Sequence, residues 1–386
     1  MRRVRLDCRH YLGDRPCGPH KRTGVTCERC GLHELSGRRV LLVKLDAMGD
    51  VLRTTCILEP LARALAAEAA GAAPHLTWLT RPESLPLLRG NPYVQRAVPY
   101  GHEGLLHALG EPFDLVVCLD AARDAARLAS LALAASSAAG RKPSAAGFLL
   151  QGAAVAPVDE RAHVWWQMGL WDDLKRANTR TYQHLMMECL GLSGPPGDYV
   201  LRLEPGELAE GRQALEAAGL ASGEPFLALN AGGGGRWEFK RWTAPHIVRF
   251  VHLARELLGL RVALFGGEAE TPFIRELLGA CPAGTFFPGV HPVRRFAAML
   301  AAASALVTGD TLAMHLALAT GCPSVILFGP TSKAEIETYG RAVKLAPEMD
   351  CLCCYLPRCE RQPYCQELLD PEPVLDAVKA VMESKP

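Results

Sequence analysis

An aspartate, a threonine and a histidine stand together where a short buried strand is predicted to turn into a helix. The apolar run Ala305–Val307 predicts the strand, and Asp310 and Thr311 are residue types that begin helices. Apolar positions at helical spacing follow as far as Gly321, and His315 lies within this helix. Ligands of open α/β sheets bind at such strand-to-helix turns. The turn therefore predicts a polar ligand site, although an ordinary capping aspartate also explains Asp310.

A second acidic position follows the first convincing strand, residues 38–45. Asp50 is predicted at the start of a helix, where the helix dipole favours an ionised carboxylate. Such a carboxylate can take a proton as a general base. A plain helix cap would use the same residue type, so the residue type alone leaves both alternatives open.

A glycine-rich turn in the second half of the chain is followed by basic residues. Backbone N–H groups of glycines can face a phosphate, and nearby cations can balance its charge. The residues concerned are Gly232, Gly233, Gly234, Arg236 and Lys240. The chain has no Gly-x-Gly-x-x-Gly sequence, which disfavours an NAD-dependent dehydrogenase.

Four short motifs, taken together, resemble glycosyltransferase family 9, the ADP-heptose heptosyltransferases of bacterial envelope synthesis. They are Lys44-x-Asp46-x-x-Gly49-Asp50, Lys240-Arg241-Trp242-Thr243, Gly266-Gly267-x-x-Glu270 and Asp310-Thr311-x-x-x-His315. Leu312 stands where the family usually has a glycine, which would let the backbone approach a diphosphate closely.

The resemblance implies a role for most of these residues. Asp50 would be the general base, Lys240 would hold the donor diphosphate, and Glu270 would accept from the ribose hydroxyls. The other implied donor-site residues are Gly232, Gly233, Gly234, Arg236, Asp310, Thr311, Leu312 and His315. The implied reaction is inverting transfer of heptose from ADP-heptose to a hydroxyl of lipopolysaccharide, or of another envelope glycan or protein.

Alternating strand and helix patterns predict two α/β domains with parallel sheets. The resemblance implies the GT-B architecture, two doubly wound Rossmann-like domains facing a cleft. We expect a cysteine-rich segment at 1–37, an acceptor domain at 38–195, a nucleotide-sugar domain at 196–350 and a closing segment at 351–386. One amphipathic helix is expected over His163–Leu192.

Composition indicates a globular protein rather than one drawn to a polyanion. The 386 residues are 49% hydrophobic and 22% charged, and the net charge is +1. A near-neutral chain has no bulk attraction to nucleic acid, so no nucleic-acid partner is expected. The N-terminus is arginine-rich with no apolar signal region, so we expect a cytoplasmic protein. Because the family's acceptors are often membrane lipids, peripheral contact with the inner membrane is a further expectation.

Nine of the 14 cysteines fall in two clusters near the ends of the chain. Thiolates in loop-rich segments of a reduced compartment favour a structural metal over disulfides. We expect one site from Cys8, Cys17, Cys27 and Cys30 and another from Cys351, Cys354, Cys359 and Cys365, with Cys353 as a spare. Zinc, iron or an iron–sulfur cluster would fit, and no redox cofactor is expected. Free thiols are the alternative.

The cysteine clusters also motivate a different class of function. The chain could be a non-catalytic protein on a transferase scaffold that binds metal or nucleic acid. Binding of a nucleoside diphosphate would separate a transferase from that alternative.

Overall fold

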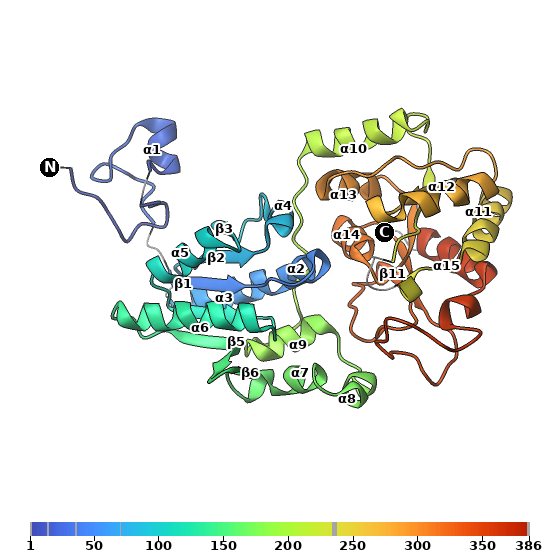
Figure 1. The fold of residues 1–386 in the computed structure, drawn as a ribbon. Coiled ribbons are helices and arrows are strands. Elements are labelled where there is room, and N and C mark those ends of the chain that lie inside the picture. Colours follow the sequence, from blue (N-terminus) through green and yellow to red (C-terminus); the bar gives the residue numbers. More distant parts are fainter. Residues whose placement is uncertain (1, 14, 35–36, 70, 234–237, 384–386) are drawn as a thin grey trace. The chain divides into compact units, whose positions relative to one another are not determined.

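The structure is a computed structural model that describes residues 2–13, 15–34, 37–69, 71–233 and 238–383. Two of the expected donor-site residues, Gly234 and Arg236, lie outside these ranges. The chain divides into two compact units. Unit 1 comprises Met1–Ala47, Cys56–Trp166 and Leu185–Gly197, and unit 2 comprises Met48–Thr55, Gln167–His184 and Asp198–Pro386. In Figure 1, unit 1 is mainly blue to green and unit 2 mainly yellow to red.

Unit 1 is built on a six-stranded sheet in the order β3-β2-β1-β4-β5-β6. All pairings are parallel except that of β5 with β6. The strands are β1 (Arg39–Val43), β2 (His75–Thr80), β3 (Arg96–Pro99), β4 (Leu115–Cys118), β5 (Ser144–Gln151) and β6 (Ala154–Pro157). The order of the first five strands is that of a Rossmann fold, whose topological switch point lies between β1 and β4.

Short helices connect the strands of unit 1. They are α3 (Leu58–Glu68), α4 (Leu85–Leu88), α5 (His102–Gly110) and α6 (Arg123–Ala138), with α1 (Gly18–Thr23) in the cysteine-rich segment. Two helices, α7 (His163–Met168) and α9 (Tyr182–Cys189), cross the boundary between the units.

Unit 2 is built on a five-stranded, fully parallel sheet in the order β11-β10-β9-β7-β8. The strands are β7 (Phe226–Asn230), β8 (Arg261–Phe265), β9 (Ala305–Gly309), β10 (Ser324–Leu327) and β11 (Ala342–Leu345). The helices are α2 (Met48–Thr54), α8 (Asp172–Ala177), α10 (Pro205–Ala217), α11 (Ala244–Leu258), α12 (Thr271–Ala280), α13 (Val293–Ala301), α14 (Leu312–Thr320) and α15 (Pro371–Glu383). The described residues also form six 3₁₀ turns: Thr55–Ile57, Pro82–Ser84, Glu160–Ala162, Glu238–Lys240, Glu268–Glu270 and Cys365–Leu368.

Helices cover both faces of the unit 2 sheet, as a parallel sheet requires. On one face, α11, α12 and α15 enclose a core that includes Leu229, Leu264, Val307 and Leu327. On the other face, Phe265 of β8 packs against Phe296 of α13 with their ring centroids 5.2 Å apart. The switch point of this sheet lies between β7 and β9, so a ligand site is expected where these two strands end.

These two sheets confirm the predicted α/β fold with two Rossmann-like domains. The prediction of one long helix over His163–Leu192 is wrong. The segment forms α7, α8 and α9 instead. Gly169 lies at the break after α7, where glycine weakens a helix, and Asn178 ends α8 in an extended conformation.

None of the described helices is both long enough and apolar enough to pass through a membrane.

Candidate donor and catalytic site

The expected donor motif surrounds the end of β9. Gly309 is the last residue of this strand, and a Cβ there would come within 2.7 Å of the Lys240 carbonyl oxygen. This close approach places Lys240 beside Asp310. The Lys240 Nζ lies 3.2 Å from Asp310 Oδ2, and both side chains are largely buried. The two motifs that carry these residues, 70 positions apart in the sequence, therefore meet at the end of β9.

The Asp310 carboxylate is held in its ionised form. Burial opposes the negative charge, but the charge of Lys240 favours it and a hydrogen bond from Thr331 adds to this, so the pKa of Asp310 lies below its usual range. Lys240 is thus oriented by a permanent partner. This arrangement gives the site one fixed cation and one fixed anion.

Thr311 begins α14, but its side chain does not cap the helix in the expected way. The Thr311 hydroxyl lies 3.0 Å from that of Thr308 and 3.1 Å from Nδ2 of Asn230, the last residue of β7. Asn230 also donates to the carbonyl oxygen of Gly232 at 3.1 Å. This amide, which the sequence analysis missed, therefore ties the glycine turn to the start of α14 across the switch point.

Glu270 lies beside the glycine turn. A Cβ on Gly232 would meet the Glu270 carboxyl carbon at 3.3 Å, and Glu270 Oε2 accepts from the Gly267 amide at 2.9 Å. The turn is described as far as Gly233. The structure therefore brings Gly232, Glu270, Thr311 and the Lys240–Asp310 pair to one end of the unit 2 sheet. Leu312 follows as the first residue of α14.

His315 lies on α14 and contacts the segment that carries Asp50. A Cβ on Gly49 would come within 2.5 Å of His315 Cδ2, so the ring packs directly against the Gly49 backbone. On its other side, His315 Nδ1 is 2.8 Å from the hydroxyl of Tyr199. Burial lowers the pKa of His315 to about 4, and the nearby Arg53 charge contributes. The ring is therefore neutral at pH 7.

Asp50 belongs to the same compact unit as Lys240 and Asp310. It lies in the first turn of α2, and its Oδ1 is 2.5 Å from an Arg53 guanidinium nitrogen. We expected Asp50 within a domain spanning 38–195, whereas residues 48–55 group with unit 2. The packing of Gly49 against His315 accounts for this difference.

A buried ion pair fixes the strand that precedes Asp50. Lys44 is fully buried after β1 and donates to Asp120, which follows β4. Lys44 Nζ also donates to the Leu119 carbonyl oxygen at 3.0 Å, and Asp120 accepts from the Leu45 amide. The pair therefore joins the ends of β1 and β4 at the switch point of unit 1. Asp50 follows a few residues later in the chain.

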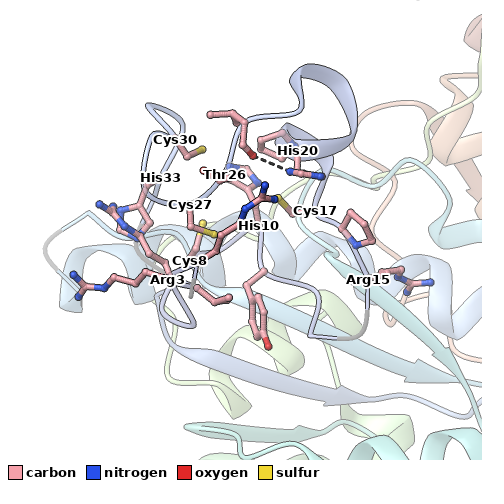
Figure 2. A pocket seen from close by; sticks show the side chains of 17 residues that line it. Arg3, Cys8, His10, Arg15, Cys17, His20, Thr26, Cys27, Cys30 and His33 are labelled. Carbon is pink, nitrogen blue, oxygen red and sulfur yellow. Dashed lines mark hydrogen bonds between the residues drawn. The ribbon is translucent and has the colours of Figure 1, made fainter.

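The first cysteine cluster lines one cavity of about 310 Å³ in the N-terminal segment. Figure 2 shows Cys8, Cys17, Cys27 and Cys30 around it, together with His10, His20 and His33. All four cysteines are free thiols. Throughout the described part of the chain, no three Cys, His, Asp or Glu side chains converge closely enough to hold an ion. The cluster is therefore gathered as expected, but not in coordination geometry.

The second cysteine cluster lies beside the end of β10. The Cys353 amide donates to the Gly329 carbonyl oxygen at 3.0 Å, and the Tyr355 amide donates to that of Pro330 at 2.8 Å. A Cβ on Gly329 would meet the Cys365 sulfur at 2.4 Å. These contacts fix the cysteine loop against the turn that follows β10.

Four of its thiols are neighbours. Burial raises the pKa of Cys365 to about 11, and the thiols of Cys354, Cys359 and Cys351 contribute. Cys353 instead lies near Ser332 and Glu335.

Comparisons with known proteins agree with the motifs. Residues 105–361, more than half of the chain, match the sequence model for glycosyltransferase family 9 (heptosyltransferase). Lipopolysaccharide heptosyltransferase 1 of Pseudomonas aeruginosa is 32% identical over 187 residues, which are 47% of this chain and 50% of that protein. The chain thus spans about half the length of the first curated relatives it matches.

Solved structures show the same fold at low sequence identity. A family 9 glycosyltransferase from Veillonella parvula has a TM-score of 0.67 at 18% identity, covering 91% of this chain and 99% of that one. The dodecameric iron-containing glycosyltransferase TibC from enterotoxigenic E. coli has a TM-score of 0.51 at 13% identity, covering 92% and 78%. With the family match, the fold and the motifs at the unit 2 switch point, this chain belongs to glycosyltransferase family 9.

Proposed function

We propose that the protein transfers heptose from ADP-heptose to a hydroxyl of lipopolysaccharide, with inversion at the anomeric carbon. The observation that carries this proposal is the position of Asp50 in the same unit as the Lys240–Asp310 pair. A base and a diphosphate site are the two parts that glycosyl transfer from a nucleotide sugar needs.

The donor diphosphate is assigned to Lys240, the turn at Gly232 and Gly233, and the start of α14 at Thr311. Gly234 and Arg236 complete this turn in the proposal. Lys240 offsets the negative charge that grows on the leaving diphosphate, and fixed charges of this kind are usually the largest contribution to catalysis. Leu312 and His315 complete the donor pocket on α14.

The two acidic residues of the donor site take different parts of the nucleotide sugar. Glu270 accepts from the ribose hydroxyls, and Asp310 accepts from hydroxyls of the sugar. Because Asp310 stays ionised, it remains an acceptor at neutral pH.

Asp50 takes the proton of the acceptor hydroxyl. The freed oxygen attacks the anomeric carbon, and the bond from that carbon to the diphosphate oxygen breaks as the new glycosidic bond forms. ADP leaves with the electron pair of the broken bond. The proton stays on Asp50 until solvent removes it, so no redox cofactor or catalytic metal is needed.

A thermal-shift comparison of ADP, GDP, UDP and NAD tests the donor assignment. A ligand that binds the folded state stabilises it by an amount that grows with the logarithm of its concentration relative to its Kd. We expect ADP to raise the melting temperature most. If none of the four does so, the donor site is refuted and the non-catalytic scaffold is favoured. A larger shift with NAD would favour a dehydrogenase.

We infer that the protein works in the cytoplasm, in peripheral contact with the inner membrane through its lipid-linked acceptor. The relatives named for lipopolysaccharide support this acceptor class. Cell fractionation tests it. We expect to recover the protein in the membrane fraction, and we expect to lose it from that fraction when lipopolysaccharide synthesis is blocked. Recovery in the periplasm would contradict the proposed location.

We further propose that both cysteine clusters hold a structural metal, zinc or iron. Four thiols around one cavity, and four more in one short loop, form ligand sets of the type that zinc and iron bind. The name of TibC supports including iron. Small side-chain rotations would have to draw the thiols together, because the described groups are not in coordination geometry.

A further inference from the structure

A buried arginine one helical turn after Asp50 forms an ion pair with the carboxylate of the proposed base. Arg53 lies on α2 three residues beyond Asp50, and its side chain is only 11% exposed. Its guanidinium approaches Asp50 Oδ1 at 2.5 Å. An arginine this deeply buried needs strong partners, since the desolvation of its charge is costly.

Two elements distant in sequence hold the Arg53 guanidinium. Its central carbon lies 3.4 Å from the centroid of the Tyr182 ring, at the start of α9. The Tyr182 amide donates to the Glu335 carbonyl oxygen at 2.8 Å. The charge of Glu335 also acts on Arg53. The guanidinium is therefore held between the Tyr182 ring and the Asp50 carboxylate.

The loop that carries Glu335 is in turn fixed by the second cysteine cluster. The Tyr355 hydroxyl donates to Glu335 Oε2 at 3.1 Å and accepts from the Ser332 amide at 3.2 Å. A continuous set of contacts thus runs from the cysteine loop through Tyr355, Glu335 and Tyr182 to Arg53 and Asp50.

We propose that Arg53 is a positioning residue for Asp50, which it orients for proton transfer, and that it is not a donor contact. This inference rests on the proposed function. With its face covered by Tyr182 and one nitrogen on Asp50, Arg53 has little surface left for a diphosphate. Small misplacements of a catalytic group can cost about 10²-fold in rate, so holding the carboxylate matters.

A double-mutant cycle tests the inference. Asp50→Asn, Arg53→Met and the double variant are compared with the wild type. Transfer from ADP-heptose to heptose-deficient lipopolysaccharide gives kcat and KM, and calorimetry gives the ADP affinity. We expect Arg53→Met to lower kcat about 10- to 100-fold while donor KM and ADP affinity stay within about twofold. In the Asp50→Asn variant, Arg53→Met should lower kcat by less than about twofold, because Arg53 acts through Asp50.

Two further variants guard against a general loss of structure. Arg249→Met removes an exposed arginine of unit 2 that pairs with Glu372, and it should leave kcat unchanged. Arg53→Lys keeps the positive charge but replaces the planar guanidinium with an ammonium group, and it should retain more activity than Arg53→Met. If Arg53→Met does not fold, Arg53→Lys with and without Asp50→Asn forms the cycle.

Three results would overturn the inference. The first is that Arg53→Met lowers kcat by the same factor in the wild-type protein and in the Asp50→Asn variant. The second is a loss of ADP affinity as large as the loss of kcat, which would make Arg53 a phosphate contact. The third is an Arg53→Met protein with wild-type kcat. If the wild-type protein itself transfers no heptose, the proposed function fails and this inference falls with it.

Discussion

Gly49 and His315 are in contact so close that no side chain fits between them. A Cβ at Gly49 would lie 2.5 Å from Cδ2 and 3.1 Å from Nε2 of the ring. Gly49 precedes the proposed base and His315 belongs to the donor motif. Because Tyr199 holds the ring from its other side at 2.8 Å, the ring has a fixed position against which α2 packs. The contact therefore sets where Asp50 lies relative to the donor motif.

Replacing Gly49 with alanine tests this contact. The added methyl group must displace a buried ring, so we expect a loss of about 1–3 kcal/mol in unfolding free energy, the range for overpacking. Transfer should fall as well. Gly206→Ala is the matched control, since a Cβ at this helical position meets nothing within 4 Å. If Gly49→Ala unfolds at the same denaturant concentration as Gly206→Ala, the contact does not constrain α2.

Replacing Lys240 with alanine should weaken ADP binding. The lost contact is charge-assisted, so we expect calorimetry to show that ADP binding is weaker by roughly 1.5–3 kcal/mol. Lys379→Ala removes an exposed lysine that pairs with Asp376, and it should bind ADP as the wild type does. Equal affinities for Lys240→Ala and wild type would move the diphosphate site, with Arg241 the nearest alternative in sequence.

The neutral state of His315 predicts a pH dependence of stability. Its pKa in the folded protein is about 4, against 6.5 for an unperturbed histidine. Between these values the unfolded chain binds a proton at this position that the folded chain excludes. Stability from this residue is therefore complete above pH 6.5 and falls as the pH drops towards 4.

Urea unfolding at several pH values measures this effect. Wild type should lose stability more steeply between pH 6.5 and 4 than His315→Gln. The same change at the exposed His252 should leave the wild-type slope intact. Parallel curves for wild type and His315→Gln would show that His315 is not kept neutral by folding.

Both cysteine clusters predict metal in the purified protein. We expect at least one zinc or iron per chain by elemental analysis, without added metal. Cys27→Ser should remove metal from the first site and Cys359→Ser from the second. Cys281→Ser, at an isolated and partly buried cysteine, should remove none. Metal well below one per chain, with all nine clustered thiols reactive under native conditions, would refute both sites.

Sequence alone could predict the elements around Asp310 because each has a local signal. The apolar run Ala305–Val307 predicted β9, and Gly321 ends α14 in the left-handed conformation that glycine favours. The family resemblance placed Asp310 and Lys240 in one donor site, but it did not predict their ion pair.

The contacts that fix Asp50 had no such signal. Tyr199 and His315 are 116 positions apart, and Arg53 contacts the ring of Tyr182, the first residue of α9. No periodicity in a single sequence predicts which distant aromatic will cover a buried arginine. The spacing of Arg53 three residues after Asp50 could have suggested an ion pair, but not its partners on α9 and beyond β10.

Transfer of a sugar is the central claim, and mass spectrometry of the acceptor measures it most directly. Wild-type protein is incubated with ADP-heptose and heptose-deficient lipopolysaccharide. The account predicts an acceptor heavier by one heptose residue, with one ADP released per transfer. Asp50→Asn, which keeps the shape of the side chain and removes the base, should transfer about 10² times more slowly or worse while binding ADP normally. An unchanged acceptor mass with wild-type protein, or transfer by Asp50→Asn at the wild-type rate, would contradict the account.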